Sequence, residues 1–438
     1  MNIFYKFSII SIILMLAASC QPEQKTVELK SDLQCTSGEF VRLALQLGHH
    51  DPHYVDAYFG PEIFKTQSEV DTLSLDVIIA RADSLVNVLD GYNPQHFDTL
   101  RRMRWEFLRS QIASLAARAR FASGIRMTFD EESRSLYGVT VDSYPEQFYK
   151  DIIQGLDTLL PGRGGIVERY IDFKKQFVIP PDDLARAIDV TLRHCKNATY
   201  KHLELPAGES FGVEYIEGEP WPAYNWFKGN AHSVIQINRD FEFHPDMVIT
   251  IAAHEAYPGH HVYHSLTEHL LYQDSGWTEF SILPLFSPFA LVSEGSANYA
   301  VSMAFPGDSR VDFAKKVIFP IAGLDTSLAG LYFKIQDMKE NLDYAGIDAA
   351  RMYLDGDITR DQTAVWLMKY QLRSREQAEK HLDFIERYRS YVVNYVAGER
   401  LVKSYVKRHG GDTSEVRRWD VFRHILTTPM TPERLRNE

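Results

Sequence analysis

Residues 253–261 read Ala-His-Glu-Ala-Tyr-Pro-Gly-His-His, which places imidazoles and a carboxylate in one short stretch of chain. A related pattern, two histidines four positions apart on one helix face, binds zinc and uses the glutamate after the first histidine as general base. Here the second histidine follows His254 by six or seven positions. The chemistry that this stretch suggests is metal-assisted hydrolysis, with Glu255 as the base.

The spacing leaves two candidates for the second imidazole. On a regular helix, at about 100° per residue, His261 shares the face of His254, whereas His260 lies about 120° away. We expect an irregular helix, because Pro258 lacks an N–H and Gly259 frees the backbone. If a π-bulge absorbs the two extra residues, His260 takes the usual place of the second ligand. We therefore predict His260 as the ligand and keep His261 as the alternative.

The surroundings of this segment favour a functional site over a chance cluster of surface histidines. The approach over residues 247–253 is apolar on nearly every face, which predicts a buried helix. Of the 16 histidines in the chain, those at positions 254, 260, 261, 264 and 269 fall close together. Buried imidazole and carboxylate groups need partners.

A zinc site needs a third protein ligand and leaves one position for water. We predict Glu294, which begins a second segment of helical period well after His260. The small residues Gly295, Ser296 and Ala297 follow and would let another helix approach closely. Two imidazoles and one carboxylate suit Zn²⁺ better than Mg²⁺ or Ca²⁺, so we expect one zinc ion.

Two motifs together resemble those of a known family. His-Glu-Ala-Tyr-Pro-Gly-His-His at 254–261 and Ser-Glu-Gly-Ser-Ala-Asn-Tyr-Ala at 293–300 are similar to motifs of the bacterial proteins catalogued as domain of unknown function 885. That family is grouped with the gluzincins, zinc metallopeptidases whose third ligand is a glutamate on a second helix. Ser296 and Asn298 depart from the family's Trp-Ala-Leu-Tyr, which affects the pocket and leaves the ligands in place.

The resemblance implies a mainly α-helical, gluzincin-like metallopeptidase that cleaves peptide bonds. In such an enzyme His254, His260 and Glu294 would hold Zn²⁺, which activates a water molecule and polarises the scissile carbonyl. Glu255 would take the proton of the attacking water and pass it to the leaving amine.

Enzymes of this broad group often bring a tyrosine or histidine from a late helix to the oxyanion. Tyr395 lies in a Tyr-Val-Ala-Gly stretch similar to the family's Tyr-x-x-Gly, so we choose Tyr395 as the donor and Tyr391 second. One good donor of this kind stabilises the transition state by a few kcal/mol. Arg389 could hold a carboxylate of the substrate.

Two other classes of function are consistent with these residues. One is a metal-dependent hydrolase that acts on a non-peptide or cell-wall amide, since the same attack serves both substrates. The other is an inactive binding lipoprotein that keeps the scaffold. The intact Glu255 disfavours a pure binding protein, because binding alone has no need of a base.

The amino terminus resembles a bacterial lipoprotein signal. After Lys6, an apolar run from Phe7 to Ala18 is too short to span a membrane, so residues 1–19 read as a signal peptide. Cys20 would then be lipidated and form the only membrane attachment, which places the protein in the cell envelope. Residues 20–36 are polar and are predicted to be a tether.

Composition and charge limit the remaining possibilities. The chain has 47 basic and 59 acidic residues, and this net charge of −12 argues against binding to nucleic acid or to a broad anionic membrane surface. No linker interrupts residues 37–438, which we interpret as one domain with a helical lobe (37–205) and a metal-site lobe (206–438). Cys35 and Cys195 could pair in an oxidising envelope.

The hydrophobic period changes just before the metal-binding segment. Residues 213–216 and 231–238 read as short strands, which predicts a small β-hairpin or sheet there. An edge strand could bind an extended peptide, oriented by Asn225, Asn230 and His232, although an ordinary hairpin that covers the core fits equally well. The His-His-Asp-Pro-His run at 49–53 is interpreted as a solvated turn and not as a metal cluster.

Overall fold

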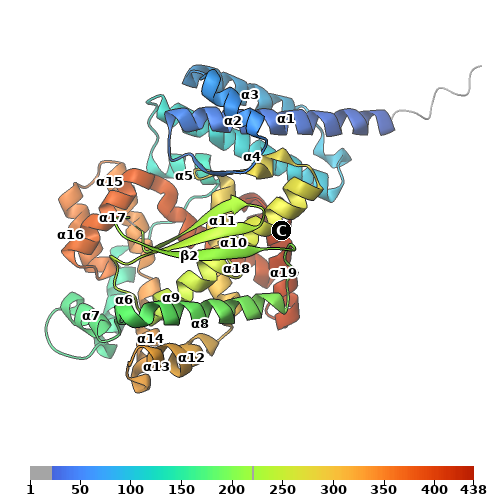
Figure 1. Cartoon of the computed structure of the whole chain (residues 1–438). Coiled ribbons are helices and arrows are strands. Elements are labelled where there is room, and N and C mark those ends of the chain that lie inside the picture. Colours follow the sequence, from blue (N-terminus) through green and yellow to red (C-terminus); the bar gives the residue numbers. More distant parts are fainter. Residues whose placement is uncertain (1–21, 220) are drawn as a thin grey trace, which may run out of the picture.

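The computed structural model describes residues 22–438 apart from residue 220. The predicted signal peptide and the lipidated Cys20 lie outside these residues. Helices dominate the described chain and two small sheets accompany them (Figure 1), which confirms the mainly α class with a small β component. Among the described residues, none of the helices has the length and apolar character that a membrane span requires.

The N-terminal helices pack together on one side of the molecule (Figure 1). They are α1 (Pro22–His50), α2 (Glu62–Val70), α3 (Leu75–Asp90) and α4 (Thr99–Ala122). Part of the segment predicted as a tether, 20–36, is thus helical. Contacts with the rest of the fold explain this, because Leu33 is buried and Gln34 Nε2 donates to Thr278 Oγ1 at 2.9 Å.

The remaining helices surround the centre of the molecule. Before the larger sheet come α5 (Phe129–Tyr137), α6 (Glu146–Leu159), α7 (Ile166–Lys175) and α8 (Pro181–Tyr200). After it come α9 (Pro245–Ile251), α10 (His260–Thr267), α11 (Pro288–Ala304), α12 (Ser309–Phe313), α13 (Phe319–Ile321), α14 (Ala329–Glu340), α15 (Asp343–Leu354), α16 (Arg360–Gln371), α17 (Arg375–Tyr388), α18 (Val393–Arg408), α19 (Glu415–Thr427) and α20 (Pro432–Asn437). Two large buried clusters each combine side chains from both sides of residue 205, so the two predicted lobes share their core.

The larger sheet contains three strands, β2 (Ser210–Ile216), β3 (Ala223–Gly229) and β4 (His232–Asn238). The order is β2-β4-β3, with β2 parallel and β3 antiparallel to β4. Residues Asn230 and Ala231, with φ of 55° and 51°, form the tight turn of the β3–β4 hairpin. The sequence pattern predicted β2 and β4 and missed β3, because proline and glycine bracket that strand.

A second, two-stranded sheet joins distant parts of the chain. Strand β1 (Val55–Tyr58) pairs antiparallel with β5 (Ile282–Pro284), which directly precedes α11. This pairing holds the segment after α1 against the centre of the molecule.

Helices α11 and α18 cross in close contact at the centre. A Cβ atom on Gly295 would lie 2.2 Å from the carbonyl carbon of Gly398, so a larger residue would force the helices apart. This agrees with the expectation that small residues after Glu294 permit close helix approach. The crossing fixes Glu294 of α11 relative to Tyr395 of α18.

Gly295→Ala should destabilise the protein, because the added methyl group has no space between the two backbones. We expect the free energy of unfolding to fall by about 1–3 kcal/mol in urea denaturation. The matched control is Gly330→Ala in α14, where an added Cβ would meet no atom within 4 Å. This control should leave stability unchanged or raise it by up to about 1 kcal/mol. Equal losses in both variants would contradict the tight crossing.

Candidate metal centre

The segment that carries the first two predicted ligands is not one continuous helix. Helix α9 passes into a π-helical turn, η2 (Ala252–Ala256), the backbone becomes extended at Tyr257, and α10 begins at His260. Gly259 makes the break possible, since a Cβ there would lie 1.9 Å from the carbonyl oxygen of His254. The expected π turn is present, but the helix then stops and restarts instead of absorbing two extra residues.

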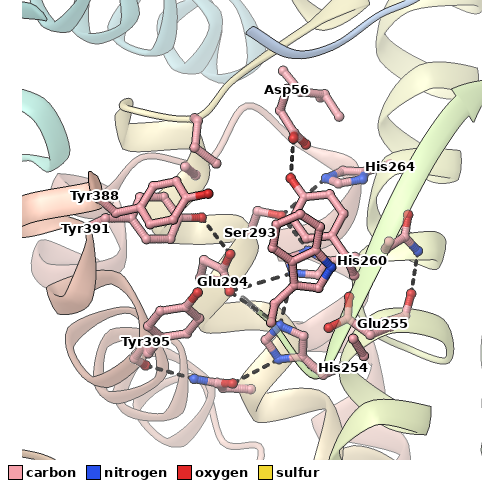
Figure 2. Close-up of a pocket in the computed structure, with 18 of the residues that line it drawn as sticks. Asp56, His254, Glu255, His260, His264, Ser293, Glu294, Tyr388, Tyr391 and Tyr395 are labelled. Carbon is pink, nitrogen blue, oxygen red and sulfur yellow. Dashed lines mark hydrogen bonds and ion pairs between the residues drawn. The ribbon is translucent and has the colours of Figure 1, made fainter. Parts of the chain in front are cut away.

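This break brings three predicted ligands together (Figure 2). His254 Nε2 lies 3.1 Å from His260 Nε2. Glu294 Oε2 lies 3.3 Å from the first nitrogen and 3.6 Å from the second. The donors of a tetrahedral zinc site, with bonds of about 2.0–2.1 Å, are separated by about 3.3 Å. Because Glu294 Oε2 is also buried without a hydrogen-bond partner, this set of donors fits a divalent metal ion.

A second carboxylate belongs to the same cluster. The candidate ligand atoms of His254, Glu255 and His260 all lie within 4.8 Å of one another. Geometry therefore offers both Glu255 and Glu294 to an ion. The two carboxylates differ in their surroundings: the Tyr391 hydroxyl donates to Oε1 of Glu294 at 2.6 Å and fixes that carboxylate. Among the described residues, no group donates a hydrogen bond to the carboxylate of Glu255, which leaves it available for proton transfer.

Hydrogen bonds behind the cluster orient the two imidazoles. His254 Nδ1 contacts Asn298 Oδ1 at 2.9 Å, and Asn298 Nδ2 donates to the backbone oxygen of Tyr395 at 3.0 Å. His260 Nδ1 contacts Ser293 Oγ at 3.0 Å. When Nδ1 is held in this way, Nε2 of each ring is left to face a metal ion.

Sequence reasoning did not identify Asn298 or Ser293 as partners of the histidines. A signal was nevertheless present. Asn298 follows Glu294 by four positions, which places both on one helix face, and Ser293 directly precedes Glu294. Asn298 is one of the two departures from the family motif. In this chain its side chain contacts His254, a predicted ligand.

Electrostatics favour positive charge between these side chains. Burial lowers the pKa of His254, but the carboxylates of Glu255 and Glu294 outweigh it and raise the pKa to about 9. Burial also acts to raise the pKa of Glu294, yet the nearby His260 and His254 hold it well below its usual value. Burial and the charge of Glu294 raise the pKa values of Tyr391 and Tyr395, so both hydroxyls keep their protons.

The alternative ligand, His261, lies outside the cluster. Its Nε2 is 2.7 Å from Glu209 Oε2, its Nδ1 is 2.9 Å from Ser233 Oγ, and the side chain is fully buried. Both ring nitrogens are thus occupied. Of the two candidates, only His260 lies beside His254 and Glu294.

The other predicted site residues divide into two groups. Tyr395 lines the cavity beside the metal cluster, as does Asn225, whose Nδ2 donates to the backbone oxygen of Glu255 at 2.5 Å. The backbone of Asn230 is bonded to Glu268, and His232 Nδ1 contacts Ser210 Oγ, so neither belongs to the cavity wall.

The structure also shows the surroundings of three further predicted features. Arg389 Nε donates to the buried Glu132 at 2.8 Å, and this ion pair neutralises the charge of the arginine. In the turn at 49–53, Asp51 pairs with Arg118 at 2.6 Å, so this residue is buried and not solvated. Cys35 and Cys195 are both free thiols, the first exposed and the second buried.

The cavity beside the cluster has a volume of about 390 Å³. Figure 2 shows Tyr388, Tyr391 and Tyr395 on one side of Glu294 and the histidines on the other. Among the described residues, nothing donates to or accepts from the hydroxyl of Tyr395, which is therefore free to meet a ligand. The volume falls in the range of small-molecule sites.

No family model matches this chain, and no curated protein matches it. Among solved structures it is similar to "the putative lipoprotein from Colwellia psychrerythraea", with a TM-score of 0.50 and 13% identity over 82% of this chain and 68% of that chain. It also matches "a putative lipoprotein of unknown function from Shewanella oneidensis", with a TM-score of 0.45 and 10% identity over 83% and 72% of the two chains. At 13% identity, the first likeness concerns the fold alone.

Substitutions at the adjacent residues His260 and His261 should show which of the two imidazoles binds the metal ion. We expect His260→Ala to weaken binding of a divalent ion by more than about 100-fold, because loss of a ligand exceeds the 10–100-fold cost typical of outer partners. His261→Gln should change affinity far less, since His261 contacts Glu209. Competition titrations with a zinc chelator would measure both, and a loss confined to His261→Gln would reverse the assignment.

Proposed function

We propose that this protein is a zinc-dependent, gluzincin-like hydrolase that cleaves peptide bonds. The observation that supports this most directly is the convergence of His254 Nε2, His260 Nε2 and Glu294 Oε2 within 3.1–3.6 Å, beside a second, unrestrained carboxylate. A protein that only stored or carried a metal ion would have no need of Glu255 at the edge of a cavity.

Each residue of the cluster has a distinct role in this proposal. His254, His260 and Glu294 would hold Zn²⁺, which would supply Lewis acidity toward a carbonyl oxygen and toward water. Glu255 would accept a proton as the water oxygen bonds to the carbonyl carbon. When the C–N bond breaks, Glu255 would return that proton to the departing nitrogen, so the base is regenerated.

Tyr395 is proposed as the donor to the oxyanion. Burial keeps its hydroxyl protonated, and no described residue competes for that proton. Tyr391 has a different task, because its hydroxyl is already bound to Glu294 Oε1. It would keep the ligand carboxylate in one orientation.

We also propose that the protein is a lipid-anchored component of the bacterial cell envelope. The signal-like run before Cys20 supports this, and the structural neighbours that are described as lipoproteins are consistent with it. Peptides in the envelope are then the proposed substrates.

Glu255→Gln tests the role of the base. The variant keeps the size of the side chain and leaves the three ligands intact, so it should bind about one zinc ion per chain, as the wild type does. Peptide cleavage should fall by at least about 100-fold, the lower range for loss of a general base. Metal analysis with mass spectrometry of a digested peptide mixture would show this. Equal cleavage by both proteins would rule out the role of Glu255.

Substitutions at two tyrosines should have different signatures. Tyr395→Phe removes the proposed oxyanion donor, so kcat should fall by about 100-fold while zinc affinity is retained. Tyr391→Phe removes a hydrogen bond to a ligand, so zinc affinity should fall by about 10-fold. Steady-state kinetics at several zinc concentrations would distinguish the two variants. An unchanged kcat in Tyr395→Phe would show that Tyr395 is not the oxyanion donor.

A further inference from the structure

The cavity beside the candidate metal ligands is lined by several acidic side chains. Three carboxylates line it, those of Asp56, Glu255 and Glu294, and no lysine or arginine among the described residues does. Glu294 and Glu255 have roles in the proposed hydrolysis. Asp56 has none, and it comes from β1, more than 190 residues before His254 in the chain.

Asp56 is held at the cavity wall by the two small sheets. Strand β1 pairs with β5, and the hydroxyl of Tyr224, on β3, donates to Asp56 Oδ1. Figure 2 shows Asp56 at one end of the pocket and His254 at the other, with His260 between them in this view. Among the described residues, nothing donates a hydrogen bond to the second oxygen of Asp56.

Among the described residues, no lysine or arginine forms an ion pair with this carboxylate. Burial raises the pKa of Asp56 to about 6, although the hydrogen bond from Tyr224 and the charge of His260 oppose that shift. At pH 7.5 most molecules therefore carry the negative charge. A partly buried carboxylate without an ion-paired partner is costly, so a cationic group of a ligand beside it would be bound favourably.

A second hydrogen-bond acceptor in the cavity, the side-chain oxygen of Asn225, also lacks a partner. Asn225 lines the cavity and is 6% exposed, and its Oδ1 is buried without a hydrogen-bond partner. Nδ2 of the same amide is already bound to the backbone of Glu255. Apart from the candidate metal ligands, the cavity offers acceptors to N–H groups. Among the described residues, no lysine or arginine lines it, and Arg389 is paired with Glu132.

We propose that Asp56 binds a protonated primary amino group of the substrate, so that this site acts on peptides that present an ammonium group beside the scissile bond. The inference rests on the proposed function and names its substrate class. A cavity of about 390 Å³ is small, which favours short peptides. The amino group can be a free amino terminus or a lysine side chain. Carboxypeptidase action is disfavoured because, among the described residues, no lysine or arginine lines the cavity to pair with a terminal carboxylate.

The test compares matched short peptides on the zinc-loaded full chain at pH 7.5. One peptide has free ends, one is N-acetylated, one is C-amidated, and one is N-acetylated but contains lysine. We expect N-acetylation to lower kcat/KM by about 30-fold or more, as loss of a buried charge pair does, while C-amidation changes it by less than about 3-fold. Recovery with the lysine peptide would identify the side chain as the source of the amine.

Asp56→Asn should reduce the preference for the free amine to within about 3-fold, because it removes the charge and keeps the shape. The matched control is Asp348→Asn, which removes another buried carboxylate that accepts a tyrosine hydroxyl, that of Tyr149 at 2.5 Å, but lies outside the cavity wall. This control should retain the preference. If Asp56→Asn does not fold, the comparison of peptides on the wild type still decides the question.

Binding of the same peptides to the Glu255→Gln protein, measured by calorimetry, separates the two proposals. Cleavage without any preference for the free amine or lysine would overturn this inference and leave the hydrolase intact. No cleavage by the wild type, with tighter binding of amine-bearing peptides that Asp56→Asn abolishes, would overturn the hydrolase and support the amine site. Neither cleavage nor selective binding would overturn both.

Discussion

The close crossing of α11 and α18 is the constraint on which the candidate site depends. Gly295 and Gly398 bring two backbones so near that no side chain fits between them. Because Glu294 precedes Gly295 and Tyr395 precedes Gly398 by three positions, this contact places a carboxylate and a tyrosine beside the histidines of the preceding segment. Asn298 then links both helices to His254.

The centre of the protein accommodates charges that a hydrophobic core would exclude. Glu294 and His254 are each less than one-tenth exposed, and each is stabilised by the other and by neighbouring groups. Such an arrangement is costly for folding unless every charge has a partner. Oε2 of Glu294 lies 3.3 Å from His254 Nε2 but makes no hydrogen bond, and buried polar atoms of this kind are commonly found where function requires them.

The two small sheets contribute more to the site than their size suggests. Strand β3 supplies Asn225 and Tyr224, and β1 supplies Asp56, so one wall of the cavity is β structure and the other is helical. Hydrogen bonds between strands hold these side chains in place, whereas helix packing holds the three predicted metal ligands. The proposed selectivity and the proposed chemistry therefore depend on different parts of the fold.

The amino-acid sequence by itself determined the features that neighbouring residues encode. These include the helical class, the His-Glu pair at 254–255, and the small residues after Glu294. Tertiary structure alone decided the rest. His260, and not His261, lies beside His254 because of a break after η2, where Gly259 packs on the carbonyl of His254. Asp56 reaches the cavity through the pairing of β1 with a strand more than 200 residues away. Periodicity and spacing report interactions within a few turns of chain, whereas these contacts depend on how distant segments pack, and no local pattern specifies that packing.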